Sequence, residues 1–438
     1  MIKRLAIVAF ITGVGHLMNL FSLKFITKYI DEDAIASIGE IDALILLIVS
    51  ITAFGLQLSS ARNIVIQDNW KQELYESQAA RFTLGLILTI FGFSGLLFTK
   101  NYMFLIAPFI SLNADYALYS RGKPISGALI AFIRIMIPSV ILITASIYLK
   151  KHVTLLFSLS IFVSYIMIGI LVSWILKTPY LVVPRFKSLK KYIDNFTIGI
   201  ASFALFFVGI GIINVMSYFY TNEAIAVIYI ALKLYMIFKG VIRIITQSFF
   251  KELQAAEMAI KVDFLAIVAG LVFLLSIVIY PQVVISLLFE KKYIYYTATF
   301  AILGIAGFIS SFTTSSSTRL LLKRQDKSYS INMVIAALIT IITGIILWFI
   351  YGSKPYLMAI AVLMGEITIS FLNVKSLNES NYILLRAKQA LTPVLLGIIF
   401  LVFKYYFGET WQSFIASVLI FGGFLVAYFI KFLNPRVK

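Results

Sequence analysis

The sequence predicts an all-α polytopic membrane protein with about 14 transmembrane helices, arranged as two six-helix lobes around a central cavity plus two C-terminal helices. Hydrophobic residues make up 61% of the 438 residues and charged residues 13%, whereas soluble domains contain roughly 45–50% and about 25%. The apolar residues form continuous runs of about 20, the length at which an α-helix crosses a bilayer, whereas the strands of a membrane barrel alternate over roughly 10 residues. The basic residues also concentrate on alternate loops, as the positive-inside rule requires.

Fourteen apolar windows are long enough to span a bilayer. They lie at residues 5–30, 38–60, 79–98, 102–120, 125–149, 153–176, 196–220, 223–250, 262–289, 295–322, 328–350, 355–376, 388–407 and 411–433. The first window follows Lys3 and Arg4, as in a signal peptide, but it is longer than one and lacks a small-x-small cleavage site. We therefore expect it to be retained as the first helix.

The distribution of basic residues predicts that both termini are cytoplasmic. With that orientation, 24 of the 37 Lys and Arg residues fall on the inner side, 8 on the outer side and 5 within the membrane. A missed helix would invert every later loop, so this bias supports an even number of spans. The pairs Lys150-Lys151 and Lys291-Lys292 run against the bias.

Weak internal similarity predicts three regions, at residues 1–192, 193–386 and 387–438. The longest linker, around 177–195, separates the first two. Asp33-Ala34-Ile35-Ala36 matches Glu223-Ala224-Ile225-Ala226 at an offset of 190, and the basic turn 121–123 matches 323–327 about 200 residues later. Two six-helix units of the same orientation would enclose a cavity between them. Chance similarity between apolar stretches is the alternative.

The composition excludes several kinds of chemistry. The chain has no Cys and only two His, so disulfides, thiol catalysis and Cys-based or His-rich metal sites are excluded, and no metal is expected. It has no Walker-type lysine loop and no Ser-His-Asp order, so we expect neither an enzyme nor a nucleotide cofactor. The net charge of +18 fits anionic lipid or a basic cavity, and it does not require nucleic acid.

The helix predicted at 223–250 has one basic face. At 100° per residue its long polar side chains lie within an arc of about 120°; they are Lys233, Lys239, Arg243, Gln247 and Lys251. Each central Lys or Arg facing lipid would cost roughly 2.5–3.5 kcal/mol, so the arc is expected to face water or an anion. For Arg243, snorkelling to the inner headgroups is the alternative.

The first helix carries a weaker polar face with His16, Asn19 and Lys24, which we expect to line the same cavity. For His16 a hydrogen-bonded interior role is the alternative to proton transfer. For Lys24 the alternative is snorkelling outward.

Two acidic residues are expected inside the membrane. Asp115 is within reach of Arg134 and is expected to form a structural ion pair with it, with ion coupling as the alternative. Glu366 has no obvious partner in the sequence, which leaves protonation or cation binding open there.

The stretches from Ile30-Asp31-Glu32-Asp33 to Arg62 and from Leu118 to Pro124 resemble the multidrug/oligosaccharidyl-lipid/polysaccharide (MOP) exporter superfamily, specifically its polysaccharide and O-antigen flippase branch. The resemblance covers roughly residues 1–385. It implies alternating-access transport of an undecaprenyl-pyrophosphate-linked oligosaccharide across the bacterial inner membrane, for O-antigen or lipopolysaccharide biosynthesis. It further implies coupling to an H⁺ or Na⁺ gradient, and membrane lipids and other polysaccharide assembly proteins as partners.

Two alternative functions follow from the same features. An ion-coupled multidrug exporter of the superfamily would be expected to carry uncompensated acids in its cavity, whereas the strongest face here is basic. A membrane polysaccharide polymerase or ligase would resemble this chain in hydropathy, but it would carry a large external loop, which the sequence lacks.

Overall fold

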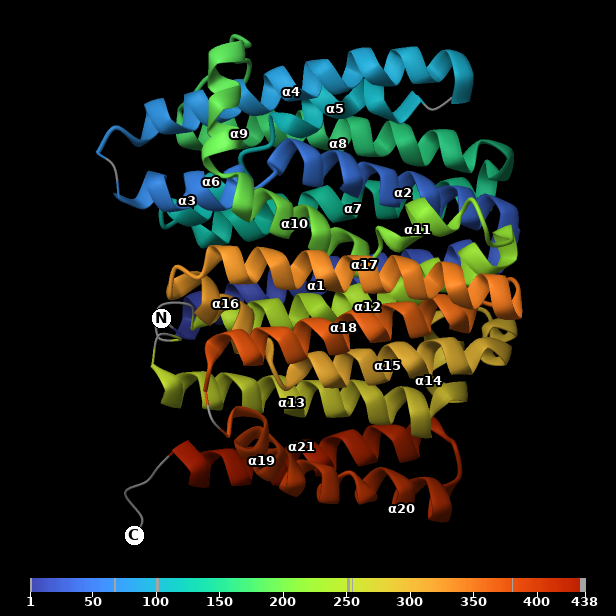
Figure 1. The fold of residues 1–438 in the computed structure, drawn as a ribbon. Helices are drawn as coiled ribbons and strands as arrows, with labels where there is room; N and C mark the ends of the chain where they lie inside the picture. Colours follow the sequence, from blue (N-terminus) through green and yellow to red (C-terminus); the bar gives the residue numbers. More distant parts are fainter. Residues whose placement is uncertain are drawn as a thin grey trace. The chain divides into compact units, whose positions relative to one another are not determined.

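The computed structural model describes residues 2–66, 68–99, 102–249, 253, 255–379 and 381–433, and their regular structure is helical (Figure 1). The chain divides into two units, residues 1–229 with 333–341, and residues 230–332 with 342–438. The helices up to the start of α12 are α1 (Ile2–Tyr29), α2 (Glu32–Ala53), α3 (Leu56–Ile66), α4 (Trp70–Thr99), α5 (Ala107–Ser111), α6 (Asp115–Ser120), α7 (Pro124–Tyr148), α8 (Val153–Leu176), α9 (Lys190–Asp194), α10 (Phe196–Val208), α11 (Ile212–Met216) and α12 (Asn222–Ser248). The later helices are α13 (Ala256–Ile279), α14 (Pro281–Leu288), α15 (Thr297–Ser311), α16 (Thr314–Leu322), α17 (Asp326–Tyr351), α18 (Pro355–Leu377), α19 (Tyr382–Leu396), α20 (Ile398–Phe407) and α21 (Trp411–Leu433).

Helices α2 and α12 begin with the same capping arrangement. The Asp31 side chain accepts a hydrogen bond from the backbone N–H of Ala34 at 2.8 Å, and the Thr221 hydroxyl accepts one from Ala224 at 3.4 Å. Such oxygens satisfy backbone donors that the first turn of a helix leaves free. The two caps are separated by the offset of 190 residues at which the sequences match, so the match has a structural counterpart.

A second local structure recurs at the other sequence match. The backbone N–H of Lys123 donates to Leu118 O at 2.8 Å, and that of Gln325 donates to Leu320 O at 2.9 Å. The preceding residues, Gly122 and Arg324, have φ of 70° and 57°. Both turns therefore end a helix with a residue in the left-handed conformation, which glycine adopts most easily. In the second turn this residue is Arg324, and the hydrogen bond from Gln325 back to Leu320 stabilises the turn.

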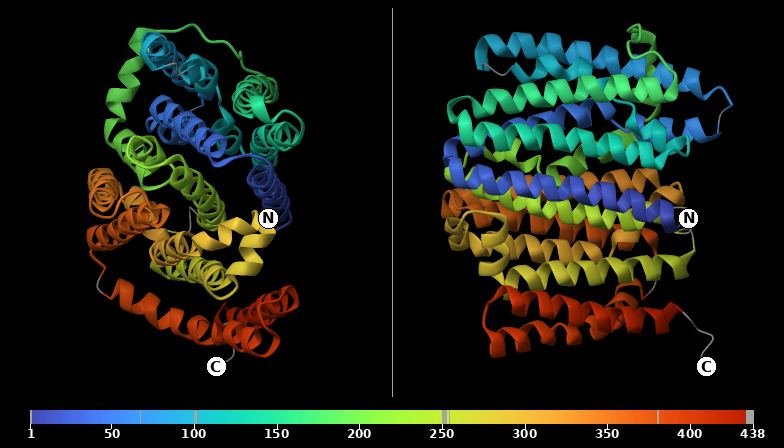
Figure 2. Two further views of the ribbon diagram at one scale, coloured as in Figure 1. Left: turned by 90° about the vertical axis from the view of Figure 1, so that its right-hand side faces the viewer. Right: turned by 180° about the vertical axis from the view of Figure 1, so that it is seen from behind.

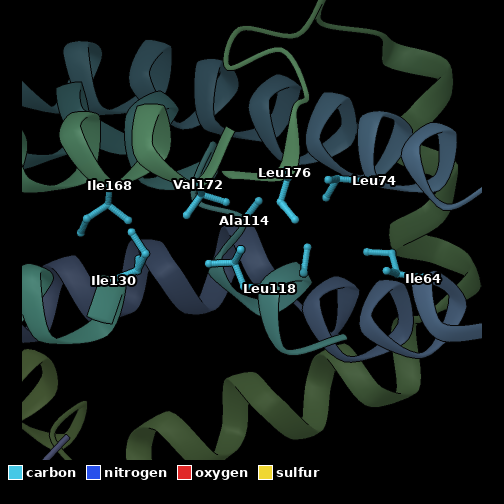
Figure 3. Close-up of a cluster of buried hydrophobic side chains, with 9 residues drawn as sticks. Ile64, Leu74, Ala114, Leu118, Ile130, Ile168, Val172 and Leu176 are labelled. Carbon is cyan, nitrogen blue, oxygen red and sulfur yellow. The ribbon is translucent and has the colours of Figure 1, made fainter. Parts of the chain in front are cut away.

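In the first unit, long helices pack side by side, with α1 along α7, α7 along α8 and α4 against α5. Apolar side chains from α3, α4, α6, α7 and α8 meet in one buried cluster (Figure 3). The cluster contains Ile64, Leu74, Ala114, Ala117, Leu118, Ile130, Ile168, Val172 and Leu176. Burial of these side chains joins segments that lie more than 100 residues apart in the sequence.

In the second unit, α13 packs on α15, α15 on α18, and the C-terminal helices α19, α20 and α21 lie together against α13 (Figure 2). A buried cluster around Tyr280, Phe400 and Phe421 forms part of this contact. The Tyr280 hydroxyl is within 2.6 Å of Ser413 Oγ and 3.2 Å of Phe400 O. The C-terminal helices are thus held by both apolar and polar contacts.

Each expected span falls on one helix or on consecutive helices, and several are divided. The expected span 196–220 breaks between α10 and α11 at Gly209 and Gly211, and 262–289 breaks before Pro281, which begins α14. Among the described residues, nine helices are long and apolar enough to cross a membrane, or ten if the pair bent by 79° at residues 186–194 and 196–208 is one span. The protein is therefore an all-α polytopic membrane protein.

The orientation of the termini remains a prediction that cysteine labelling can test. The chain contains no Cys, so Ser188→Cys or Lys354→Cys introduces the only thiol. With cytoplasmic termini, the thiol at position 188 resists an impermeant reagent in intact cells and the thiol at position 354 reacts. Lysed cells, in which both react, are the control, and the reverse pattern in intact cells would invert the topology.

Candidate functional site

The basic face of α12 contributes three cationic side chains within the second unit. Lys233 and Lys239 are partly buried and Arg243 is exposed. Lys239 Nζ lies 2.9 Å from Glu366 Oε1 and 3.0 Å from Oε2. The side chain of Lys239 is 32% exposed and that of Glu366 only 5%, so the ammonium is the accessible member of the pair.

Glu366 on α18 also accepts a hydrogen bond from Tyr235 Oη at 2.5 Å. The expectation that this acid has no partner is therefore wrong. Both partners lie about 130 positions earlier in the sequence, on the turn of α12 where Tyr235 precedes Lys239 by four residues. A buried carboxylate is tolerated when it is paired and hydrogen-bonded, and both conditions are met here.

Arg243 lies one turn after Lys239 on the same face. Among the described residues, no acidic side chain forms an ion pair with it. The side chain of Gln247, expected on this face, lies outside the described part of the chain. The α12 face therefore presents one paired and one exposed cation, together with the partly buried Lys233.

The polar residues of α1 belong to the first unit. His16, Asn19 and Lys24 are all partly buried. Hydroxyl groups of this helix bond to its own backbone, since Ser22 Oγ donates to Asn19 O at 2.7 Å and Thr27 Oγ1 to Lys24 O at 3.0 Å. A role for the three residues in a cavity shared with α12 remains a prediction.

Asp115 and Arg134 lie together in the first unit. Arg134 Nη1 donates to Asp115 Oδ2 at 2.9 Å, and their side chains are 34% and 16% exposed, the arginine being the more exposed. Asp115 is the first residue of α6, and Arg134 lies in the middle of α7, which packs against it. The expected pairing has the required geometry.

Neutralising one member of this pair is expected to lower the yield of folded protein, because the other is left as a partly buried, unpaired charge. Asp115→Asn and Arg134→Gln test this singly, and the double variant should recover part of the lost yield. The measurement is the monodisperse fraction after purification. If the double variant loses more of the monodisperse fraction than the two single variants lose together, the pair does not stabilise the fold.

A buried polar network on α13 was not expected from the sequence. Asp263, which is 0% exposed, accepts hydrogen bonds from Arg386 Nε at 3.0 Å and from Tyr382 Oη at 2.8 Å. It also accepts from the backbone N–H and the hydroxyl of Ser315, both at 2.8 Å. The sequence feature that could have indicated this network is the single acidic residue at the second position of the expected span 262–289.

Arg81 is a second residue whose place differs from the simple expectation. It is one of the 24 basic residues expected on the inner side of the membrane, but it is 1% exposed within α4. Its Nη1 donates to Asn113 O at 2.6 Å, and its guanidinium carbon lies 5.8 Å from the centre of the Tyr116 ring. It therefore stabilises the turn between α5 and α6.

No protein-family model matches the sequence, and no curated protein is similar to it. Solved structures share its fold over most of its length. The lipid II flippase MurJ in an inward closed conformation superposes with a TM-score of 0.70 at 18% identity, over 97% of this chain and 99% of that one. An outward-facing multidrug resistance MATE family transporter of the MOP superfamily superposes with a TM-score of 0.58 at 14% identity, over 89% of this chain and 95% of that one. A MOP superfamily transporter from Pyrococcus furiosus, described as having a binding pocket of reverse polarity, superposes with a TM-score of 0.55 at 13% identity, over 88% of this chain and 94% of that one.

The chain therefore shares the fold of the solved MurJ flippase and MATE transporter structures. The predicted all-α polytopic fold class is confirmed, and the number of 14 spans and the central cavity remain predictions. The polysaccharide flippase branch, the roles of the site residues and the three sequence regions remain predictions.

Proposed function

We propose that this protein is a MOP-type transporter that flips an undecaprenyl-pyrophosphate-linked oligosaccharide across a bacterial inner membrane by alternating access. The observation that carries the proposal is the α12 face, where Lys233, Lys239 and Arg243 follow one another on one side of the helix. Arg243 is exposed, and Lys239 is the accessible member of its ion pair. Cations on an apolar span suit an anionic substrate.

A pyrophosphate matches this set of groups in charge and in donor geometry. Its oxygens accept charge-assisted hydrogen bonds, which are shorter and about twice as strong as neutral ones. The guanidinium of Arg243 can bind two oxygens at once, whereas each lysine supplies a compact point charge. The sugars need polar surroundings, and the polyprenyl chain can remain in lipid.

The ion pair with Glu366 suggests how transport is coupled to an ion gradient. Pyrophosphate and Glu366 compete for the ammonium group of Lys239, which both carboxylate oxygens now contact. When Lys239 turns to the substrate, Glu366 is left buried with Tyr235 alone, and a buried unpaired charge is costly. Uptake of H⁺ or Na⁺ by Glu366 removes that cost. His16 is a second titratable candidate within α1.

Flipping is therefore expected to require an ion gradient. The test uses the purified protein in sealed vesicles with a lipid-linked oligosaccharide, whose exposure to an external glycosidase or lectin reports its leaflet. A proton or sodium gradient should raise the rate, and an ionophore that collapses the gradient should lower it again. Equal rates with and without either gradient would refute the coupling.

An ion-coupled multidrug exporter remains the second candidate, because MATE transporters share the fold. Binding of a cationic drug favours an uncompensated acid, but Glu366 is already neutralised by Lys239. Transport of a cationic dye by vesicles that fail to flip lipid-linked sugar would favour the drug exporter. The expected partners follow from the first candidate, namely the lipid-linked glycan, membrane lipids and other polysaccharide assembly proteins.

A further inference from the structure

A small basic cavity lies at the end of α16 and shares no residue with the α12 site. It has a volume of about 290 Å³ and is lined by Leu253, Arg319, Leu322 and Lys323. A water molecule takes roughly 30 Å³ in the liquid, and pockets for drug-sized ligands begin near about 300 Å³. The cavity therefore has room for several water molecules or for a small polar group such as a phosphate.

Arg319 brings an unsatisfied donor to this cavity. Its side chain is 3% exposed, and its Nη1 donates to Glu379 Oε2 at 2.5 Å. Its Nε atom is also buried and has no hydrogen-bond partner among the described residues. A guanidinium carries five N–H donors, and a buried charged donor without an acceptor is destabilising. A small movement of this side chain towards an acceptor in the cavity would remove that penalty.

The cavity also carries an excess positive charge. Lys323 Nζ lies 3.3 Å from Glu379 Oε1, so one acid is shared between two cations, and the lysine side chain is 41% exposed. Partial burial opposes the charge of Glu379, but the hydrogen bonds and charges of Arg319 and Lys323 outweigh it and lower the pKa of that carboxyl below its ordinary value. Glu379 is therefore ionised at neutral pH, and one positive charge remains for a ligand.

We propose that this cavity binds a phosphate group, which accepts from the guanidinium of Arg319 and from Lys323 Nζ. Arg and Lys together are a favourable set for phosphate oxygens. The remaining walls, Leu253 and Leu322, are apolar and suit the carbon atoms next to the phosphate in a phospholipid headgroup. The cavity lies at the end of α16, next to Arg324 in the following turn and Lys327 at the start of α17, and basic residues in such a cluster attract anionic lipid headgroups. An anionic phospholipid is thus one source of the phosphate, and free phosphate is the other.

Binding can be measured on the full-length protein without any transport assay. The protein is placed in nanodiscs of phosphatidylcholine, and either phosphatidylglycerol is added to the lipid or inorganic phosphate is added to the buffer in increasing amounts. The rise in melting temperature then gives the apparent affinity. Lys323→Gln should weaken that affinity roughly tenfold, the effect of one charge-assisted contact. Glu379→Gln should strengthen it, because both cations are then free for the anion.

Lys327→Gln is the matched control, because Lys327 is also exposed and follows in the next helix, but it does not line the cavity. A response to phosphatidylglycerol alone assigns the site to a lipid headgroup, and an equal response to inorganic phosphate assigns it to the free anion. Equal losses in Lys323→Gln and Lys327→Gln, or no loss in Lys323→Gln, would overturn the proposal. Because the measurement is binding, its failure leaves the proposed flippase function unaffected.

Discussion

Lys239→Gln and Arg243→Gln are expected to abolish or cripple glycan export while the protein still inserts in the membrane. Each change removes one charge-assisted contact to the pyrophosphate, which costs about 1.5–3 kcal/mol and therefore roughly tenfold or more in affinity. Arg243→Lys should retain partial activity, because the charge remains but the two-pronged donor geometry is lost. The measurement is surface glycan in a strain that depends on this protein, normalised to its abundance in the membrane.

The ion pair with Glu366 requires a further variant. Lys239→Gln also leaves Glu366 buried with only Tyr235 as partner, so lost export could reflect damage to the protein instead of lost binding. The double variant Lys239→Gln with Glu366→Gln removes both charges. If Lys239 binds phosphate, the double variant remains inactive although its folded yield recovers.

Lys375→Gln provides the matched control for charge. Lys375 is an exposed lysine on α18, the helix that carries Glu366, and its loss should leave export unchanged. Normal export by both Lys239→Gln and Arg243→Gln at wild-type abundance would show that the basic face is structural and that the substrate binds elsewhere. Recovery of export in the double variant would assign Lys239 to neutralising Glu366.

The fold class could be predicted from the sequence because the formation of a membrane helix depends on the hydropathy and spacing of residues close together in the chain. Apolar runs of about 20 residues and the 3.6-residue period are enough to place a helix and to set Lys233, Lys239 and Arg243 on one side of it. The Asp115–Arg134 contact was also within reach, because the two residues lie 19 positions apart on consecutive helices. Breaks such as the one at Gly209 depend on backbone freedom that a hydropathy window does not detect.

The longer-range polar contacts were not accessible in the same way. Glu366 meets Lys239 across 127 positions, and Asp263 meets Arg386 across 123. Neither partner can be chosen from composition, because any buried acid could in principle pair with any of several cations on other helices. Arg386 is one of the 24 basic residues expected on the inner side, because it lies between the expected spans 355–376 and 388–407, yet it is 3% exposed. Packing of helices, which the sequence alone does not give, decides these pairs.

Asp263→Asn is expected to destabilise the protein strongly. The change leaves the guanidinium of Arg386 buried without its counter-ion, and breaking a buried ion pair in this way costs about 3–5 kcal/mol of the free energy of unfolding. Tyr382→Phe removes one hydrogen bond to the same carboxylate and should cost only about 1 kcal/mol. Both effects should appear as lower melting temperatures of the purified protein, in that order. Because Arg386 and Tyr382 belong to α19, the first of the C-terminal helices, Asp263→Asn should also increase proteolysis or hydrogen exchange in α19 to α21.

Glu257→Gln is the matched control, because it removes a carboxylate from the same helix, α13. Glu257 pairs with Lys261 at 2.8 Å one turn away, but its side chain is 81% exposed, so its loss should leave the melting temperature nearly unchanged. The double variant Asp263→Asn with Arg386→Met removes the unpaired charge and should regain part of the lost stability. A melting temperature for Asp263→Asn no lower than that of Glu257→Gln would contradict the role of the network. So would exchange in α19 that does not change, since Asp263 would then not hold the C-terminal helices on α13.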